Sequence, residues 1–367
     1  MNLRQSLLPI LTAALAFGAS GARAAVFCVS SGPQLQTAIN QAEANGEIDE
    51  IRLKPGLYFA TPQAAGEASF DYLSTEPLIV FGVTVDGNNN CTTFAARSDQ
   101  AVLSGVDQFP VMRIRANSGA SGAWSIAHLT ITDGLATAGN VGGLDLRARP
   151  GSAAIMSAIN LIIRDCNSNG DGNPLASALR VYAEDSDSAL RVLGSVIRNN
   201  RSSQFAPVLL TGEAGTGISF SNNTIAFNAG DAEVGPVSAT DYAVETGGGG
   251  SVFLSNNVFH ANTRGSDLAP ADFSADTDFV SLQMDHNHIN ALSAAGVVDN
   301  FRTQGDPRFV SDSDLRLRVN SPLRNSGNNT PQGGLWSVDV EGSLRVQGGV
   351  VDRGAYEFGE LLINGFG

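Results

Sequence analysis

Apolar and polar positions in the second half of the chain follow a phrase that returns about every thirty residues. "SNNTIAFN" at 221–228 and "SNNVFHAN" at 255–262 each place an apolar pair between Asn-containing turns, and weaker copies stand at 128–134, 160–166, 194–200 and 286–290. The central apolar residues, which we call the anchors, are Ile131, Ile163, Ile197, Ile225, Phe259 and Ile289, spaced by 32, 34, 28, 34 and 30 residues. A period of this length indicates a repeat architecture.

The repeats are rich in Gly, Asn and β-branched residues, a composition that disfavours helical hairpins. Between the anchors, residues 142–148, 177–183, 206–212 and 241–247 alternate as half-buried strands do. Each repeat therefore predicts one coil of three short strands, and stacked coils place equivalent positions in columns about 4.8 Å apart. The residues predict an all-β solenoid.

Asparagine recurs at fixed distances from the anchors. Three residues before them stand Asn160, Asn222 and Asn256, two before stand Asn223, Asn257 and Asn287, and three after stand Asn200, Asn228 and Asn262. Asparagine tolerates the left-handed backbone conformation of a tight corner, and stacked amides can bond from coil to coil. We expect these residues to turn the corners and to form ladders.

Both ends of the chain differ from the repeats. Residues 31–46 predict a short capping helix, with an apolar stripe at Leu35, Ile39 and Ala42 and a stop at Gly46, which covers the raw edge of the first coil. Residues 1–24 have the basic start, short apolar run and small-residue cleavage site of a signal peptide. A membrane anchor is the alternative, disfavoured by the Ala-rich composition of the run.

No Pro-rich or charge-rich linker divides the rest, so residues 25–305 are expected to form one β-helix with its cap, and residues 306–367 its C-terminal end. The 22 basic and 36 acidic residues give a net charge of −14, about −16 without residues 1–24. This charge disfavours nucleic acid and anionic membranes as partners. No later segment is long and apolar enough to span a membrane, and we expect a monomer.

An exported protein meets an oxidising compartment, where two of the three cysteines should pair. We expect a disulfide between Cys28 and Cys91, because both flank the N-terminal region. Cys166 falls inside the repeats and is expected to be a small buried filler.

Several segments carry a resemblance to a known family: "FCVSSGPQLQTAINQAEANGEIDEIRLKPGLY" from 27, "VDGNNNCTTF" at 85–94, "GDPRFVSDSDLRLRVNSPLRNSGNN" from 305, and "VDRGAYEF" at 351–358. They resemble exported bacterial right-handed parallel β-helix proteins of the choice-of-anchor Q type, related in fold to pectin lyases. The resemblance implies a right-handed parallel β-helix and supports the Cys28–Cys91 pair. The tail "LLINGFG" is similar to a short ending of some members, but no long sorting helix follows, so free secretion is expected.

Candidate chemistry lies one and two residues past the anchors. Arg164 and Arg198 should sit on neighbouring coils, with Asp133 and Asp165 in the next column. One interpretation is a catalytic patch in which an arginine accepts a proton or holds a sugar carboxylate while the aspartates bind Ca²⁺. The other is a solvated charge ladder, which is common on strand surfaces.

A possible Ca²⁺ loop at 165–173 offers the oxygen ligands Asp165, Asn167, Asn169 and Asp171. It lacks the distal Glu of such loops, because position 176 is Ala, so a polar turn is the alternative. No other cofactor is expected.

Two functions follow. The first is a non-catalytic, glycan- or surface-binding exported module, with Tyr182, Tyr242 and Trp124 as possible stacking faces. The second is a polysaccharide lyase or glycoside hydrolase acting along the β-helix flank. The first is preferred because the aspartate and lysine sets of glycan-cleaving β-helix relatives are missing, and because an acidic surface handles polyuronates poorly without a cation site.

Overall fold

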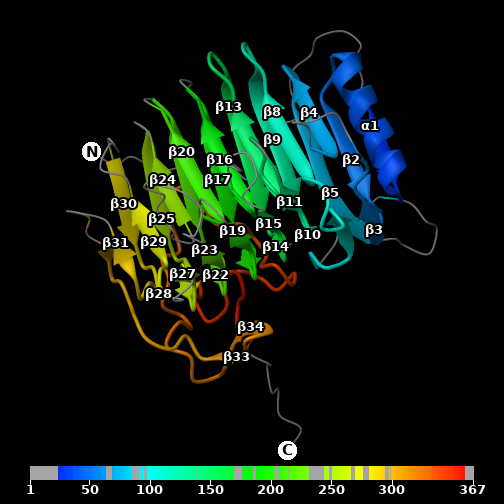
Figure 1. Ribbon diagram of the computed structural model, residues 1–367. Coiled ribbons are helices and arrows are strands. Elements are labelled where there is room, and N and C mark those ends of the chain that lie inside the picture. The colour runs from blue at the N-terminus through cyan, green and yellow to red at the C-terminus, as the bar shows by residue number, and fades with distance from the viewer. Residues whose placement is uncertain are drawn as a thin grey trace, which may run out of the picture.

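The chain is an all-β parallel β-helix with one helix at its N-terminal end (Figure 1). The computed structural model describes residues 24–62, 68–84, 91, 93–94, 97–137, 139–168, 176–184, 187–202, 206–213, 215–230, 244–247, 250–265, 269–275, 281–293, 297 and 299–359. Successive coils lie side by side, and the colour runs along the stack from blue at α1 to yellow at β30. The sequence prediction of the fold class is confirmed.

Four parallel sheets run along the stack. Sheet I contains β1 Val26–Val29, β2 Asp49–Leu53, β5 Leu78–Thr84, β6 Thr93–Phe94, β9 Ser121–Ala127, β13 Ala153–Ile159, β17 Ala189–Leu193, β21 Gly217–Ser221, β25 Ser251–Ser255, β30 Ser281–Asp285 and β32 Asp299–Asn300. Sheet II contains β3 Gly56–Phe59, β7 Ala101–Ser104, β10 Thr130–Thr132, β14 Ile162–Arg164, β18 Val196–Arg198, β22 Thr224–Ala226 and β26 Val258–His260.

Sheet III is built from strands of two residues each. It contains β11 Leu135–Ala136, β15 Asn167–Ser168, β19 Arg201–Ser202, β23 Ala229–Gly230, β27 Thr263–Arg264 and β28 Ala269–Pro270, the last two of which pair antiparallel. Sheet IV contains β4 Phe70–Ser74, β8 Met112–Ala116, β12 Leu144–Ala148, β16 Leu179–Ala183, β20 Val208–Gly212, β24 Val244–Gly247, β29 Phe273–Ala275 and β31 Leu292–Ser293.

The anchors form one continuous column on sheet II. Each is in register with the next, from Ile131 through Ile163, Ile197 and Ile225 to Phe259. All of them are fully buried, as is Ile289 in the following coil. The thirty-residue period therefore corresponds to one coil, as the sequence predicted.

The position three residues before each anchor turns the corner between sheets I and II. Its backbone is left-handed in all six repeats that carry an anchor, with φ between 48° and 64° at His128, Asn160, Gly194, Asn222, Asn256 and His286. Glycine and asparagine adopt this conformation at little cost, which explains their recurrence here. The predicted corner role of this column is confirmed.

The first amide ladder stands three residues after the anchors and contains Asn200, Asn228 and Asn262, all buried. Asn228 Nδ2 donates to the Ile197 carbonyl and to Asn262 Oδ1, both at 3.0 Å. Its Oδ1 accepts from Nδ2 and the backbone N–H of Asn200 at 2.9 and 3.1 Å. Every polar atom of this side chain is paired, which avoids the cost of about 1–3 kcal/mol for each unpaired buried group.

A second ladder, two residues before the anchors, consists of Asn223, Asn257 and Asn287, which bond in the same pattern. Each ladder needs an acceptor after its last amide, and a carboxylate supplies it. Asp272 Oδ1 accepts from Asn262 Nδ2 at 3.0 Å, and Asp299 Oδ1 accepts from Asn287 Nδ2 at 3.3 Å. The predicted ladders are confirmed. The carboxylates at their ends were not predicted from the sequence.

The N-terminal end is closed by α1, Gly32–Asn45, as predicted. The Ser31 side chain caps its start by accepting from the Gln34 N–H, and Gly46 ends it with φ 71°. Residues Leu35, Ile39 and Ala42 are fully buried on the first coil. No helix of the described residues is long and apolar enough to cross a membrane.

The predicted disulfide is confirmed: Cys28 of β1 is bonded to Cys91, and their Cα atoms lie 5.9 Å apart. Cys166 is fully buried, and burial raises the pKa of its thiol to about 12, so it is an inert filler of the core. The predicted signal peptide, residues 1–24, lies outside the described residues except for Ala24.

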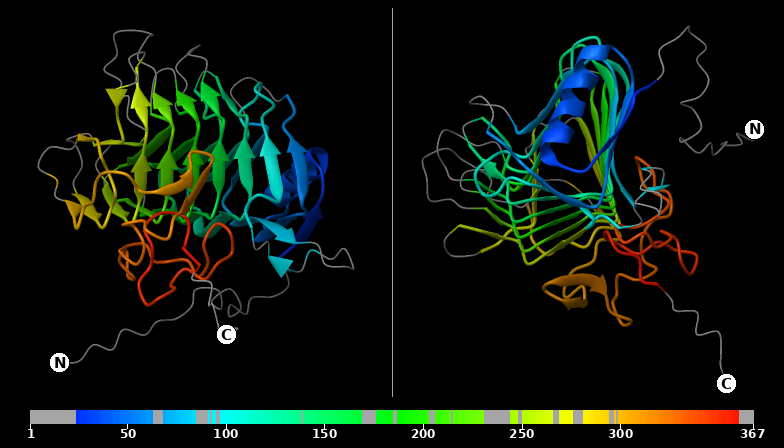
Figure 2. Two further views of the ribbon diagram at one scale, coloured as in Figure 1. Left: turned by 90° about the horizontal axis from the view of Figure 1, so that it is seen from below. Right: turned by 90° about the vertical axis from the view of Figure 1, so that its right-hand side faces the viewer.

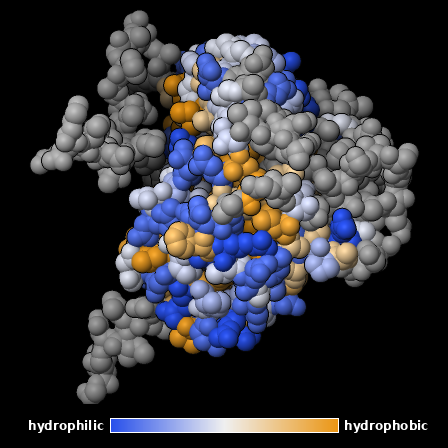
Figure 3. Space-filling model, turned by 90° about the vertical axis from the view of Figure 1, so that its left-hand side faces the viewer, coloured by the Kyte–Doolittle hydropathy of each residue, from blue (hydrophilic) through white to orange (hydrophobic). Residues whose placement is uncertain are grey.

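The opposite end of the stack has no helical cap among the described residues. Figure 3, which views this end, shows apolar side chains along its middle with polar side chains beside them. Leu282, Leu292 and Val297 are half-buried against the core, and Phe301 is 71% exposed.

The C-terminal segment, residues 306–359, lies outside the coils along the flank of sheet II (Figure 2). Its short hairpin, β33 Phe309–Ser311 and β34 Asp314–Leu317, pairs only within itself. The sequence placed residues 306–367 at the C-terminal end of the β-helix. In the structure the described part adds no coil and folds back along the side.

We predict that Asn228→Ala destabilises the protein by about 2–4 kcal/mol, because it leaves groups of two neighbouring coils unpaired in the core. Urea unfolding of both proteins measures this free energy. Exposed Asn320→Ala is the control and should change stability by less than about 0.5 kcal/mol. Equal stabilities of the two variants would contradict a structural role for the ladder.

We predict a pH-dependent effect at the end of the second ladder. Burial raises the pKa of Asp299 from 3.8 to about 6, so the folded state binds its proton more tightly than the unfolded chain. The resulting stabilisation is fully present below about pH 3.8 and is lost as the pH rises through about 6. Asp299→Asn should therefore raise the Tm at pH 7, with the gap to the natural protein closing toward pH 4.

Thermal scans across this pH range test the prediction, with exposed Asp312→Asn as the control. A Tm gap for Asp299→Asn that stays constant with pH would show that the carboxyl group does not titrate as its burial requires.

Candidate functional site

The predicted residues Arg164 and Arg198 lie in register on neighbouring strands of sheet II and point outward, as expected. Arg164 Nη1 contacts Asp165 Oδ2 at 2.5 Å. Asp133 Oδ2 accepts from Ser104 Oγ at 3.1 Å. Both aspartates have left-handed backbones, with φ of 53° and 56°. The structure thus brings the four residues onto one flank and gives three of them local partners.

The C-terminal segment occupies the Arg198 side of this flank. Arg198 Nη1 donates to the Ser313 carbonyl at 2.8 Å. The His260 ring, two coils further on, meets Phe309 edge-on at 5.6 Å. Apolar residues of the segment pack on the outward residues of sheet II in one cluster: Val196, Ala226, Val258, Phe309, Leu315, Leu317, Leu323, Val340 and Ala355. The segment also reaches the coil of Arg164, where Ile162 packs against this cluster.

The motif at 351–358 bonds directly to the coils. Gly354 N–H donates to the Asn256 carbonyl at 2.7 Å, and the Ala355 N–H donates to Thr224 Oγ1 at 2.9 Å. Asn222 Nδ2 donates to the Asp352 carbonyl at 3.1 Å. The motif therefore recognises the corner asparagines of the β-helix.

Charged groups of the segment are buried behind this contact. Arg345 is 1% exposed and donates to the carbonyls of Gly354 and Ala355. Burial, and then the nearby Asp352 charge, raise the pKa of Glu357 to about 8. These groups hold the segment together internally, and solvent does not reach them.

The candidate Ca²⁺ loop is only partly described. Asn167 forms the start of β15 and pairs with Leu135 and Arg201. Asn169 and Asp171 lie outside the described residues. Among the described residues, no three His, Cys, Asp or Glu side chains are grouped to hold a metal ion. The Ca²⁺ site stays a prediction.

Sheet IV carries a different constellation on its outer surface, which sequence analysis missed. On β8, β12 and β16 the side chains of Ile114, Leu146 and Val181 point into the core, so their neighbours point outward. We call the outward set the arginine face; it comprises Arg113, Arg115, Arg147, Arg180 and Tyr182 with the acids Asp71, Asp145, Glu184 and Glu213.

Two columns make up the arginine face. The first runs Asp71, Arg113, Asp145, Arg180 across β4, β8, β12 and β16, and alternates in charge. The second runs Leu73, Arg115, Arg147, Tyr182 across the same strands, and places two arginines directly opposite each other. Only the first follows the opposite-charge pairing that stabilises neighbouring strands.

The ion pairs of the face differ in burial. Arg180 holds Asp145 with two bonds of 2.8 and 2.6 Å, and both side chains are at least 92% buried. Asp71 is shared by Arg113 and Arg115. Arg147 pairs with Glu184 through Nε alone, and its side chain is 32% exposed against 11% for the acid. Solvent therefore meets the guanidinium of that pair more than its carboxylate.

Tyr182 lies among these charges. The guanidinium carbons of Arg147 and Arg180 lie 5.3 and 5.6 Å from its ring centre, within the range of cation–π contacts. Its hydroxyl donates to Glu213 Oε1 at 2.8 Å. Burial, and then the bond to Glu213, raise the pKa of Tyr182, so the hydroxyl stays protonated at neutral pH.

The other proposed stacking residues do not join this face. Trp124 is 1% exposed and belongs to the core, and Tyr242 lies outside the described residues. The signal for the arginine face was present in "MRIRA", "LDLRA" and "LRVYA", whose outward positions align once the coils are stacked. The columns that the sequence analysis counted from the anchors did not include these strands of sheet IV.

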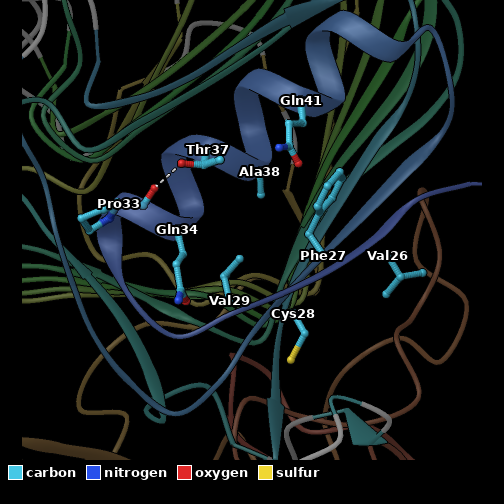
Figure 4. Close-up of a pocket in the computed structure, with 9 residues that line it drawn as sticks. All are labelled: Val26, Phe27, Cys28, Val29, Pro33, Gln34, Thr37, Ala38 and Gln41. Carbon is cyan, nitrogen blue, oxygen red and sulfur yellow. Dashed lines mark hydrogen bonds between the residues drawn. The ribbon is translucent and has the colours of Figure 1, made fainter.

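A pocket of about 460 Å³ lies elsewhere, between β1 and α1 (Figure 4). Its lining residues are Val26, Phe27, Cys28, Val29, Pro33, Gln34, Thr37, Ala38 and Gln41. No charged side chain is among them, and the Thr37 hydroxyl donates to the Pro33 carbonyl at 2.9 Å. The pocket offers no group that could carry out acid–base chemistry.

No protein-family profile and no curated protein matches the chain. Among solved structures that match is the crystal structure of an alginate lyase from Paenibacillus sp. str. FPU-7, at 13% sequence identity. The match covers 76% of this chain and 98% of that chain, with a TM-score of 0.26. A similarity at this TM-score does not bear on the site.

We predict that Gly354→Ala loosens the C-terminal segment from the coils. Its φ of 93° disfavours a side chain, and an added Cβ would lie 2.7 Å from Thr224 Oγ1, so the docking should weaken by about 1–3 kcal/mol. Limited proteolysis should then cut within residues 306–359 faster than in the natural protein. Gly359→Ala, where nothing lies within 4 Å, is the control and should leave the cleavage rate unchanged.

Proposed function

We propose that the protein is exported through residues 1–24 and acts outside the cytoplasm as a non-catalytic module that binds glycans or a glycan-covered surface. The Cys28–Cys91 disulfide supports export, because such bonds persist in oxidising compartments. We further propose that it is related to the choice-of-anchor Q proteins. The motif at 351–358, which carries that resemblance, docks the C-terminal segment on the β-helix.

The arginine face is the observation that carries the binding proposal. It offers a flat row of side chains on successive coils, in which an aromatic ring adjoins guanidinium groups. Aromatic rings and polar side chains together suit sugars, which have apolar ring faces and hydroxyl edges. The flank of sheet II is less suitable, because the C-terminal segment covers its Arg198 side.

Catalysis is the second candidate, either as a polysaccharide lyase or as a glycoside hydrolase. The Tyr182–Glu213 hydrogen bond favours it, since a hydroxyl paired with a carboxylate can transfer a proton. The raised pKa of Tyr182 argues against this hydroxyl as a base at neutral pH. The predicted patch of Arg164, Arg198, Asp133 and Asp165, with Ca²⁺, remains the other place for such chemistry.

We predict that Tyr182→Ala weakens glycan binding by about tenfold, because a contact aromatic residue commonly contributes more than 1 kcal/mol. The purified mature protein should be screened by affinity electrophoresis against neutral and acidic polysaccharides. The control is Phe301→Ala, which removes an exposed ring at the far end of the stack and should leave binding unchanged.

The same samples, incubated with Ca²⁺, should be assayed for unsaturated products and reducing ends. Turnover that Arg198→Ala abolishes would replace the binding proposal with the catalytic one at sheet II. Turnover lost in Tyr182→Ala alone would place the chemistry on the arginine face.

A further inference from the structure

The pairing of Arg115 with Arg147 has no structural explanation within the described residues. They stand directly opposite on β8 and β12, where like charges destabilise neighbouring strands. Each has an acidic partner beside the column, Asp71 for Arg115 and Glu184 for Arg147, but neither acid stands between the two arginines. The same strands carry a column of alternating charges beside this one. The strand geometry therefore does not require two arginines to face each other.

Both guanidinium groups have hydrogen-bond donors to spare. A guanidinium carries five N–H bonds. Toward the described residues, Arg115 uses only Nη2, on Asp71, and its Nε is buried without a partner. Arg147 uses only Nε, on Glu184. Arg147 therefore keeps the edge formed by Nη1 and Nη2 for a carboxylate, and Arg115 keeps Nη1.

The charge balance on this face differs from that of the whole chain. The chain carries a net charge of −14, which repels polyanions in general. On the arginine face, four guanidinium groups stand with the four carboxylates of Asp71, Asp145, Glu184 and Glu213, so the face is close to neutral. An anionic ligand is therefore repelled less by this face than by the acidic chain as a whole.

The second column also fits a long ligand. Arg115, Arg147 and Tyr182 stand on three successive coils, one strand spacing of about 4.8 Å apart, so their row follows the axis of the β-helix. We propose that this row binds a carboxylated glycan lying along the axis, with its carboxylates on Arg115 and Arg147 and a sugar ring against Tyr182. This inference rests on the proposed glycan-binding function and names its ligand class.

The test compares polygalacturonate with its fully methyl-esterified form, which keeps the backbone and removes the charge. Binding to each is measured by isothermal titration at low and high salt. The double variant Arg115→Gln/Arg147→Gln removes the two cations, and Arg97→Gln is the matched control, because Arg97 is an exposed arginine that is ion-paired with Asp99. Thermal unfolding verifies that each variant is folded.

We expect the natural protein and Arg97→Gln to bind polygalacturonate at least about tenfold more tightly than the ester, with the preference lost in the double variant and reduced at high salt. Equal binding of acid and ester would overturn the inference but leave the glycan-binding function standing. No binding to any polysaccharide would overturn both. A loss in Arg97→Gln that matches the double variant would also overturn the inference, because any surface cation would then contribute equally.

A sulfated dextran and a duplex DNA serve as competitors. If the row recognises carboxylated sugars, the sulfated dextran and the DNA should both compete weakly, because the row combines guanidinium donors with an aromatic ring. Equal competition by DNA would contradict a glycan ligand and show a general polyanion surface.

Discussion

Lateral pairing of one coil on the next is the constraint on which the rest of the structure depends. The backbone bonds of each parallel strand are completed only by its neighbours, and the corners between sheets would leave polar groups buried without partners. The two amide ladders meet that need, because each asparagine pairs with the coil before it and the coil after it. The carboxylates of Asp272 and Asp299 end the series where no further amide follows.

This regularity turns the outer surface into columns whose members are about thirty residues apart in the chain but adjacent in space. Sheet II and sheet IV use their columns differently. The outward residues of sheet II receive the C-terminal segment, whose motif bonds to the corner residues Asn222 and Asn256. The outward residues of sheet IV bear the arginine face. One flank is thus engaged within the chain, and the other presents charges and an aromatic ring.

The fold could be predicted from the sequence because the anchors and asparagines repeat with the period of the coil. The same reasoning placed Arg164 and Arg198 side by side, which the structure confirms. It could not show that residues 306–359 return to cover Arg198, since that contact joins positions more than a hundred residues apart through a non-repeating segment. It also missed Tyr182 beside Arg147, because the loops before sheet IV vary in length and break the simple count from the anchors.

The two columns of the arginine face separate structural from functional charge within the same strands. Asp145 and Arg180 are almost fully buried and satisfy each other with two bonds, as a pair that stabilises neighbouring coils should. Arg115 and Arg147 stand directly opposite each other and leave donors unused, although each has an acidic partner beside the column. Folding alone would favour an acid at either position. Folding does not require two facing arginines beside an aromatic ring. This arrangement is most simply explained by an anionic ligand that pairs with the two arginines.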